Sequence, residues 1–176
     1  MGLFFKWCTI QLETLGLKGK KMDLKVVKIR KEARLPTRAH PTDAGLDLYF
    51  CPNGERDKIV REEGLAIEPR DSMLIPTGLR IEVPPGYMLE IKNKSGIAYK
   101  RQLVVGACVV DSGYEGEIYV NLHNIGFNTQ YLKPGTKIAQ AVLIQINYCI
   151  IKEVAEEEFS QGSPRGIGGF GSTGAK

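Results

Sequence analysis

The chain has 176 residues, 43% of them hydrophobic, with 20 glycines, 9 prolines and a formal net charge of +4. This length indicates one domain with some additional chain, and the glycines and prolines favour short strands over long helices. Residues 1–22 hold four lysines and one glutamate, so the remaining residues carry a charge of only +1, which excludes a strongly basic nucleic-acid-binding surface.

The cysteines and the first residues indicate the compartment. The four cysteines are far apart without a C-x-x-C pair and only two histidines are present, so we expect neither a zinc site nor a disulfide framework. No apolar run approaches the ~20 residues of a membrane span, and Leu3–Phe5 is too short for a signal-peptide core. Lys6 stands where a myristoylation signal has Ser or Thr. We therefore predict a cytoplasmic protein without a membrane partner, with residues 1–22 as a disordered extension or an upstream segment before a start at Met22.

The domain is expected to span residues 23–151, beginning with a strand around Leu24 to Arg30. A prolyl loop then leads into the alternating segment Leu46-Asp47-Leu48, which predicts a second strand. Asp47 points away from the two leucines, so it is either a solvated carboxylate or an acid at the rim of a site. Gly45 before it permits a close backbone approach.

Short strands and one short helix follow. Residues 51–64 are polar and predict a surface loop, and the next strands are expected at Met73 to Ile75, Leu79 to Val83 and Tyr87 to Ile91. Such short strands, separated by turns, indicate a sandwich or barrel. Ser95 is a candidate N-cap for the helix. A helix start beside Lys94 can hold a phosphate, or it is an ordinary capped turn with solvated lysines.

A β-hairpin is predicted from Leu103 to Asn124. Its first arm contains the valines of 103–110, and its second arm alternates apolar and polar residues over 117–122. The bend between the arms places Asp111 and Tyr114 three residues apart, and glycines there allow a tight turn. We therefore expect a carboxylate and an aromatic ring to face one space. The alternative is that Asp111 caps the turn and Tyr114 packs against the hairpin end.

The end of the chain has distinct parts. Ile138 to Ile146 is nearly all apolar and predicts a central strand buried on both faces, in which Gln140 satisfies backbone groups or faces the pocket of Asp111. Residues 152–164 are acidic, then rich in turn residues, and predict a linker to a glycine-rich arm at residues 165–176. The arm is either a floppy tail or a segment that orders when a nucleotide is present.

Five stretches together closely resemble the five ordered motifs of the trimeric dUTP pyrophosphatases, or dUTPases. They are Ala44-Gly45-Leu46-Asp47-Leu48, Lys94-Ser95-Gly96, Val110-Asp111-Ser112-Gly113-Tyr114-Glu115-Gly116-Glu117, Gly135-Thr136-Lys137-Ile138-Ala139-Gln140, and Arg165-Gly166-Ile167-Gly168-Gly169-Phe170-Gly171-Ser172-Thr173-Gly174. Each motif alone is a weak signal, whereas the five in the family's order are a specific one.

The resemblance implies an all-β, jelly-roll-like barrel or sandwich with one short helix and a flexible C-terminal arm that closes the active site. It implies a homotrimer with shared active sites that hydrolyses dUTP to dUMP and pyrophosphate with Mg²⁺. Asp111 would deprotonate the water that attacks the α-phosphorus, and Tyr114 would stack on the deoxyribose. Asp47 would touch the metal only through a water, because the substrate phosphates would hold most of the metal's coordination sites.

The remaining implied contacts are to the nucleotide. The resemblance assigns the uracil edge to the backbone of Val105, Cys108, Val109 and Val110, and further substrate contacts to Lys94, Ser95, Gly96, Gln140, Arg165, Phe170, Gly171, Ser172 and Thr173. Three positions differ from the usual pattern, since Lys94 replaces an arginine, Cys108 a glycine and Gly113 an acidic residue.

Two alternatives stay open. One is a deaminase of dCTP with the same fold, which would need a different acid-base set in the hairpin. The other is a non-catalytic regulator that binds dUTP as a switch and uses residues 1–22 to engage a partner.

Overall fold

The computed structural model describes residues 22–54, 64–159, 162, 166 and 168, in which short strands dominate. The elements are β1 (Lys25–Lys28), β2 (Leu46–Tyr49), β3 (Leu65–Ile67), β4 (Ser72–Pro76), β5 (Leu79–Glu82), β6 (Tyr87–Lys92), α2 (Ser95–Arg101), β7 (Leu103–Val105), β8 (Val109–Val110), β9 (Tyr119–Asn124), β10 (Gln130–Leu132), β11 (Lys137–Gln145) and the 3-10 helix η1 (Glu156–Glu158). Residues 1–21 of the predicted N-terminal extension, most of the predicted surface loop at 51–64 and most of the predicted arm lie outside the described residues.

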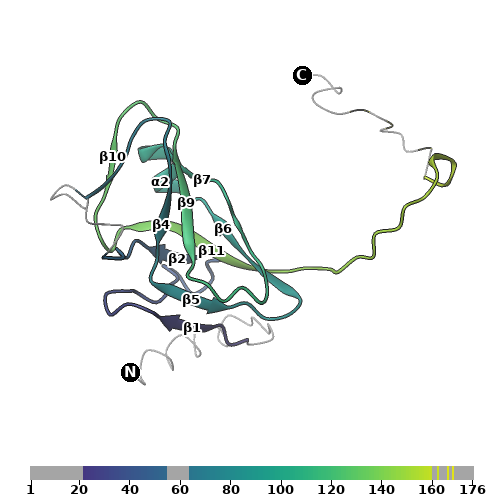
Figure 1. Cartoon of the computed structure of the whole chain (residues 1–176), viewed down its shortest axis with the longest axis horizontal. Helices are drawn as coiled ribbons and strands as arrows, with labels where there is room; N and C mark the ends of the chain where they lie inside the picture. The colour runs from purple at the N-terminus through teal and green to yellow at the C-terminus, as the bar shows by residue number, and fades with distance from the viewer. Residues whose placement is uncertain (1–21, 55–63, 160–161, 163–165, 167, 169–176) are drawn as a thin grey trace. The chain divides into compact units, whose positions relative to one another are not determined.

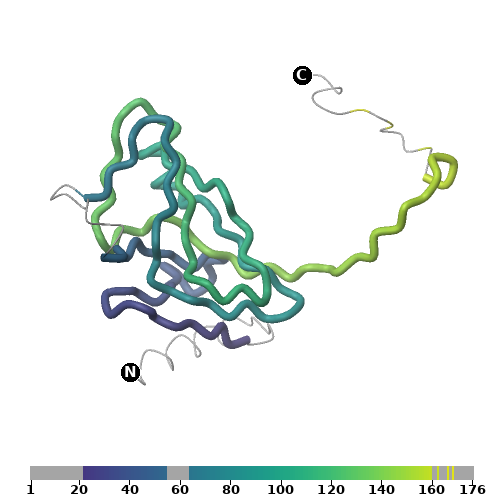
Figure 2. The backbone as a smooth tube through the Cα atoms, in the orientation of Figure 1, coloured from purple at the N-terminus to yellow at the C-terminus, as the bar shows by residue number. Residues whose placement is uncertain are grey.

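The paired strands are antiparallel and form two larger sheets and two smaller pairs (Figure 1). The larger sheets have the orders β2-β11-β6-β8 and β4-β9-β7, and the pairs are β1-β5 and β3-β10. The tube in Figure 2 shows how β1, early in the chain, runs beside β5. This jelly-roll-like arrangement of strands with a short helix confirms the predicted fold class.

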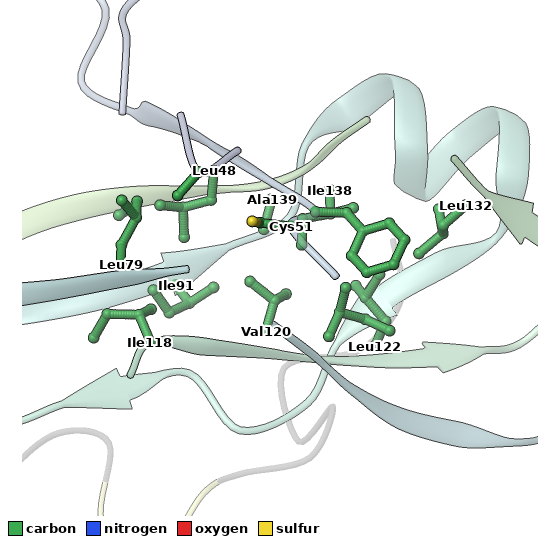
Figure 3. Close-up of a cluster of buried hydrophobic side chains, with 14 of the residues drawn as sticks. Leu48, Cys51, Leu79, Ile91, Ile118, Val120, Leu122, Leu132, Ile138 and Ala139 are labelled. Carbon is green, nitrogen blue, oxygen red and sulfur yellow. The ribbon is translucent and has the colours of Figure 1, made fainter. Parts of the chain in front are cut away.

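The core lies between the sheets because inward residues alternate with outward ones. In β9, Val120, Leu122 and Asn124 are buried, whereas the residues between them are partly exposed. Figure 3 shows side chains of both larger sheets meeting in one cluster, with Val120 and Leu122 from β9 and Leu48 and Ala139 from β2 and β11. Burial therefore alternates along the strand with the same period of two residues that predicted the strand.

The predicted hairpin is confirmed for the first half of its first arm and wrong for the second half. Strand β7 does pair with β9, with Leu103 opposite Asn124, but Val109 and Val110 of β8 pair with β6 instead. The reason is that a strand has two edges, and β4 and β7 occupy both edges of β9. The chain therefore passes from one sheet to the other at residues 106–108, a segment that we call the crossover.

The other strand predictions are mostly confirmed. Strands β1, β2, β4, β5 and β6 lie where the sequence pattern placed them, within a few residues. Strands β3 and β10 were not predicted, and they pair with each other over three residues each. A strand of that length is too short to show a period of two.

The short helix is confirmed, but its N-cap is Lys94 and not Ser95. Lys94 has an extended backbone with φ of −91° and ψ of 123°, and its side chain makes no capping hydrogen bond. The amide groups of Ile97 and Ala98 both donate to the Lys94 carbonyl, which makes Ser95 the first helical residue. The hydroxyl of Ser95 is therefore not used as the cap of α2.

Strand β11 is central only along its first half. It pairs with β6 as far as Gln145, but its pairing with β2 ends at Ala141. Accordingly Ile138, Ala139 and Ala141 are buried, whereas Val142 and the residues that follow are partly or fully exposed. The prediction of burial on both faces is right for the first half of the strand and wrong for the second. The chain divides into two compact units soon after this strand, at residues 146 and 147.

Candidate functional site

A pocket of about 300 Å³ opens beside the crossover and the turn that follows β8. Its walls come from β4, β6, β8, β9 and these two connecting segments. The lining residues are Leu74, Ile91, Ala107, Cys108, Val109, Val110, Asp111, Tyr114, Glu117, Ile118, Tyr119 and Asn121. The predicted carboxylate and aromatic ring, Asp111 and Tyr114, thus face one space as expected.

The turn after β8 fixes the Tyr114 ring at the pocket wall. The Tyr114 amide donates to the Asp111 carbonyl at 3.3 Å, and the Tyr114 hydroxyl donates to the Glu117 carbonyl at 3.0 Å. Gly113 has a φ of 88°, a conformation that residues with a Cβ rarely adopt. A Cβ on Gly116 would overlap the Tyr114 hydroxyl oxygen. These glycines therefore let the ring lie against the turn with one face open.

An ion pair supports this turn. The Glu117 carboxylate pairs with the guanidinium of Arg30, whose Nη1 donates to Glu117 Oε2 at 2.9 Å, and it accepts from the Gly78 amide at 2.7 Å. Burial by itself raises the pKa of Glu117, but the hydrogen bonds from Arg30 and from Gly78 outweigh it and hold the pKa below its usual value. The pair thus links the segment before β9 to the segment after β1.

Glu117→Gln is expected to lower the free energy of unfolding by about 2 kcal/mol, because it leaves the guanidinium of Arg30 without its counter-charge. The Glu117 side chain is only 9% exposed, whereas that of Glu115 is 88% exposed and lies 3.9 Å from Arg80. Glu115→Gln is therefore the matched control, with little expected effect. Urea denaturation of both variants at pH 7 measures the difference, and equal losses would contradict the role of Glu117.

The stabilisation by Glu117 is also expected to depend on pH. Because the folded-state pKa of Glu117 is lowered, its contribution is fully present above the unfolded pKa of about 4.3 and is lost as the pH falls through the folded value. The stability difference between the wild type and Glu117→Gln should therefore be constant above about pH 5 and shrink below about pH 4. A stability difference between the two proteins that grows as the pH falls would contradict this prediction, because a carboxylate with a lowered pKa loses its contribution in acid.

Hydrogen bonds hold the crossover that forms one wall of the pocket. The Gly106 amide donates to the Asn121 carbonyl at 2.9 Å, the Ala107 amide to Asn121 Oδ1 at 3.2 Å, and the Cys108 carbonyl accepts from the Ile91 amide at 2.7 Å. Among the described residues, the non-glycine residues with positive φ are Arg70 and Gln102, so Cys108 has an ordinary backbone conformation. A cysteine in place of glycine is therefore compatible with this wall.

A second cluster of predicted site residues surrounds Asp47, and the interpretation of Asp47 as a solvated carboxylate is wrong. Asp47 is 3% exposed, with Lys94 Nζ at 2.7 Å from Oδ1 and Lys137 Nζ at 2.6 Å from Oδ2. Its amide donates to the Thr37 carbonyl, which places the prolyl loop over this edge of β2. Burial alone raises the pKa of Asp47, but Lys137 and Lys94 outweigh it and hold the pKa below its usual value.

Gln140 belongs to this second cluster. Its Nε2 donates to the Asn93 carbonyl at 2.9 Å, which confirms that the amide satisfies neighbouring backbone. A Cβ on Gly45 would overlap Gln140 Oε1, so this side chain fits only against a glycine. The Asn93 side chain also accepts from the Val105 amide at 2.6 Å. The segment before α2 is therefore tied to both β11 and β7.

The structure thus divides the predicted site residues into groups. Cys108, Val109, Val110, Asp111 and Tyr114 line the pocket. The predicted residues that do not line it are Asp47, Lys94, Ser95, Gly96, Val105 and Gln140, and those outside the described residues are Arg165, Phe170, Gly171, Ser172 and Thr173.

Sequence reasoning missed the polar residues Tyr119 and Asn121 of the pocket wall. Both lie on the outward face of β9. The period of two could have identified them, because alternate residues of a strand share a face. The missing information was that this face closes a pocket and does not face open solvent.

The described residues offer no ready metal cage. In this part of the chain, no group of three or more His, Cys, Asp or Glu side chains is arranged to hold a metal ion. Cys51, Cys108 and Cys149 are free thiols. Within the same ranges, no helix has the length and apolar character that crossing a membrane requires.

Comparison with known proteins gives consistent matches. A dUTPase family model matches residues 31–174. The chain is 43% identical over 155 residues to a deoxyuridine 5'-triphosphate nucleotidohydrolase of Gloeothece citriformis, covering 87% of this chain and 97% of that protein. It is 39% identical over 155 residues to the protein of the same name from Clostridium kluyveri, covering 87% and 99%.

Solved structures agree with these sequence matches. A mutant dUTPase of Staphylococcus bacteriophage 80alpha with dUpNHpp has a TM-score of 0.72 and 28% identity, covering 88% of this chain and 99% of that one. A mutant dUTPase of phage phi11 of S. aureus, which coordinates a structural Mg(II) ion, has a TM-score of 0.66 and 26% identity, covering 78% and 99%.

Proposed function

This chain belongs to the dUTPase family and hydrolyses dUTP to dUMP and pyrophosphate, and we propose that Asp111 is the general base of that reaction. The observation that carries the proposal is the shared pocket of Asp111 and Tyr114, bounded by the crossover backbone. An exposed carboxylate in such a pocket can accept the proton of a water that attacks the α-phosphorus. A single base suffices when the phosphates are already aligned and their charge is neutralised.

Tyr114 is proposed to select deoxyribose. Its ring is fixed by the bond from its hydroxyl to the Glu117 carbonyl, yet the residue is 48% exposed and so keeps an open face. A ring held in this way can stack on C2′ and leave no room for a ribose hydroxyl. The backbone of the crossover and β8 is proposed to read the uracil edge, because fixed donors and acceptors reject the amino group of cytosine.

The second cluster, together with Ser95 and Gly96 that follow Lys94 in the chain, is proposed to serve the pocket of another subunit. Lys94, Ser95, Gly96 and Gln140 do not line the pocket of their own chain, yet they belong to the motifs that hold the nucleotide in the family that the sequence resembles. A homotrimer with sites shared between subunits accounts for this separation. The partly exposed Lys94 supplies charge to a phosphate, and Ser95 and Gly96 supply a hydroxyl and accessible backbone.

The side chains of this chain that could bind a metal suit an ion that is held mainly by the substrate. The described residues offer no cage of three or more His, Cys, Asp or Glu ligands, and both oxygens of Asp47 lie within ion-pair distance of lysines. When bound, Mg²⁺ neutralises and aligns the phosphates. We propose that the triphosphate holds the ion and that Asp47 contacts it through a water at most.

Tyr114→Ala is expected to relax the choice of sugar. The wild type should cleave dUTP far faster than UTP, dCTP or dTTP, and the variant should lower the ratio of kcat/KM for dUTP over UTP by about tenfold or more, because the steric exclusion of the 2′-hydroxyl is lost. Pyrophosphate release measures each rate. Tyr131→Ala is the control, since Tyr131 is also exposed but lies on β10, outside the pocket. An unchanged ratio in Tyr114→Ala would contradict the sugar-selecting role.

The two alternative functions are less well supported. Ammonia release from dCTP in the same assay would indicate a deaminase, whereas the presence of Asp111 and Tyr114 in one pocket favours hydrolysis of dUTP. A regulator without catalysis would bind dUTP and release no pyrophosphate. The named relatives are nucleotidohydrolases, which favours the enzyme over both.

The cellular location of the protein and the roles of the two ends of its chain stay predictions. A cytoplasmic location is supported by the wide spacing of the four cysteines, which suits a reducing compartment. The domain is still expected to span residues 23–151, with an extension before it and a linker and arm after it.

A further inference from the structure

We propose that Asn121 is a positioning residue that sets the specificity for the base, by holding the crossover backbone in the register that reads uracil. The inference rests on the proposed function of the crossover and β8 as the reader of the base. It goes beyond that function because Asn121 lies on β9, in the sheet opposite β8. None of the five sequence motifs contains this residue.

Asn121 holds the crossover at two successive amides. Its main-chain carbonyl accepts from Gly106 at 2.9 Å, and its side-chain Oδ1 accepts from Ala107 at 3.2 Å. The hydrogen bond from Gly106 to the main-chain carbonyl can form with any residue at position 121, whereas the hydrogen bond from Ala107 to Oδ1 requires this side chain. The Ala107 amide immediately precedes Cys108, Val109 and Val110, which line the pocket.

The Asn121 amide group contacts two further side chains. Its Nδ2 donates to Ser72 Oγ at 2.9 Å, and His123 Nε2 lies 2.9 Å from the same Oδ1 that serves Ala107. The Ala107 amide identifies which end of the Asn121 amide group faces the crossover, because a backbone N–H only donates and needs the oxygen, whereas the Ser72 hydroxyl can accept from Nδ2. Oδ1 is therefore directed at the Ala107 amide.

Gly106 shows how closely the crossover packs on these side chains. A Cβ on Gly106 would overlap both Asn121 Oδ1 and His123 Nε2. Only a residue without a side chain permits this approach. The crossover backbone therefore rests directly on the Asn121 and His123 side chains, so a change at Asn121 alters the support of the pocket wall.

A small displacement of this wall affects the choice of base more than the chemical step. Hydrogen bonds weaken steeply as their angles leave the linear range, and uracil differs from cytosine at the edge that the backbone reads. Asp111 lies beyond β8, whose pairing with β6 does not involve Asn121. We therefore expect Asn121 to affect kcat/KM and selectivity while kcat stays nearly constant.

The test compares the ratio of kcat/KM for dUTP over dCTP in four proteins, because both substrates carry the same charge and charge effects cancel in the ratio. Asn121→Ala removes Oδ1 and should lower the ratio about tenfold relative to the wild type, with kcat for dUTP changed less than about threefold. Asn121→Asp keeps an acceptor for Ala107 and should stay within about threefold of the wild type. Ser72→Ala, which removes only the partner of Nδ2, should do the same.

Amide hydrogen exchange at Ala107, measured without nucleotide, provides a second readout. It should be faster in Asn121→Ala and unchanged in Asn121→Asp. If Asn121→Ala does not fold, Asn121→Ser replaces it, since its side chain is too short to reach Ala107. An unchanged ratio in the variant that lacks the acceptor, or an equal loss in Asn121→Asp, would overturn the proposal. Absence of dUTP hydrolysis in the wild type would contradict the proposed function instead, and exchange at Ala107 would still decide whether Asn121 anchors the crossover.

Discussion

Asp111→Asn is expected to lower the turnover of dUTP by at least about 10²-fold, the lower range for the loss of a general base. Asparagine has nearly the shape of aspartate but cannot take a proton from water at neutral pH. Asp111 is exposed, so the substitution should leave the fold and nucleotide binding intact. The effect should therefore appear in kcat and not in the affinity for a non-hydrolysable analogue of dUTP.

The matched control for this prediction is Asp23→Asn. Asp23 is an exposed carboxylate before β1 and outside the pocket, so its substitution should leave turnover unchanged. Single-turnover measurement of pyrophosphate release with both variants separates chemistry from product release. Turnover of Asp111→Asn near that of the wild type would refute the assignment of Asp111 as the base.

Removal of residues 165–176 is expected to leave a folded protein with little dUTPase activity. This segment supplies Arg165, Ser172 and Thr173, which can donate to phosphate, and Phe170, whose ring can cover the base. A chain with this glycine content loses much conformational entropy when it orders, so its ordering should require those contacts. Removal of Ala175 and Lys176 alone is the control, because it spares all four side chains.

Mixed assemblies of the same variants show whether sites are shared between subunits. The linker of residues 152–164 can span roughly 40 Å when extended at about 3.3 Å per residue, enough to reach another subunit. Asp111→Asn and the truncated protein, unfolded and reassembled together, should then recover activity, because some sites combine an intact Asp111 with an intact arm. Mixtures as inactive as both parents would indicate that each arm serves the Asp111 of its own chain.

The part of the pocket that is built from one short stretch of sequence could be predicted from the residue pattern of that stretch. Asp111 and Tyr114 stand in one turn, and the short spacing and the glycines around them were enough to place both at one wall. The partners of β8 were not predictable in this way, because they depend on which strand edges are free. Val109 and Val110 resemble the valines of β7 in composition, yet β9 had no edge left for them.

Asp47 shows a second limit of pattern reasoning. An aspartate between two leucines of a strand predicts a solvated side chain, since alternate residues point to opposite faces. The covering loop at Thr37 and the two lysines, Lys94 and Lys137, come from separate segments of the sequence. Their convergence on one carboxylate follows from the topology and leaves no local signal.

The pocket is a seam between the two larger sheets. Ile91, Val109 and Val110 belong to the sheet of β6 and β8, whereas Leu74 and Asn121 belong to the sheet of β4 and β9. A nucleotide bound in this proposed site would bridge two layers that are otherwise held together by their packed side chains. Because a ligand that binds only the folded state stabilises it by mass action, bound nucleotide should also raise the resistance of this domain to unfolding and proteolysis.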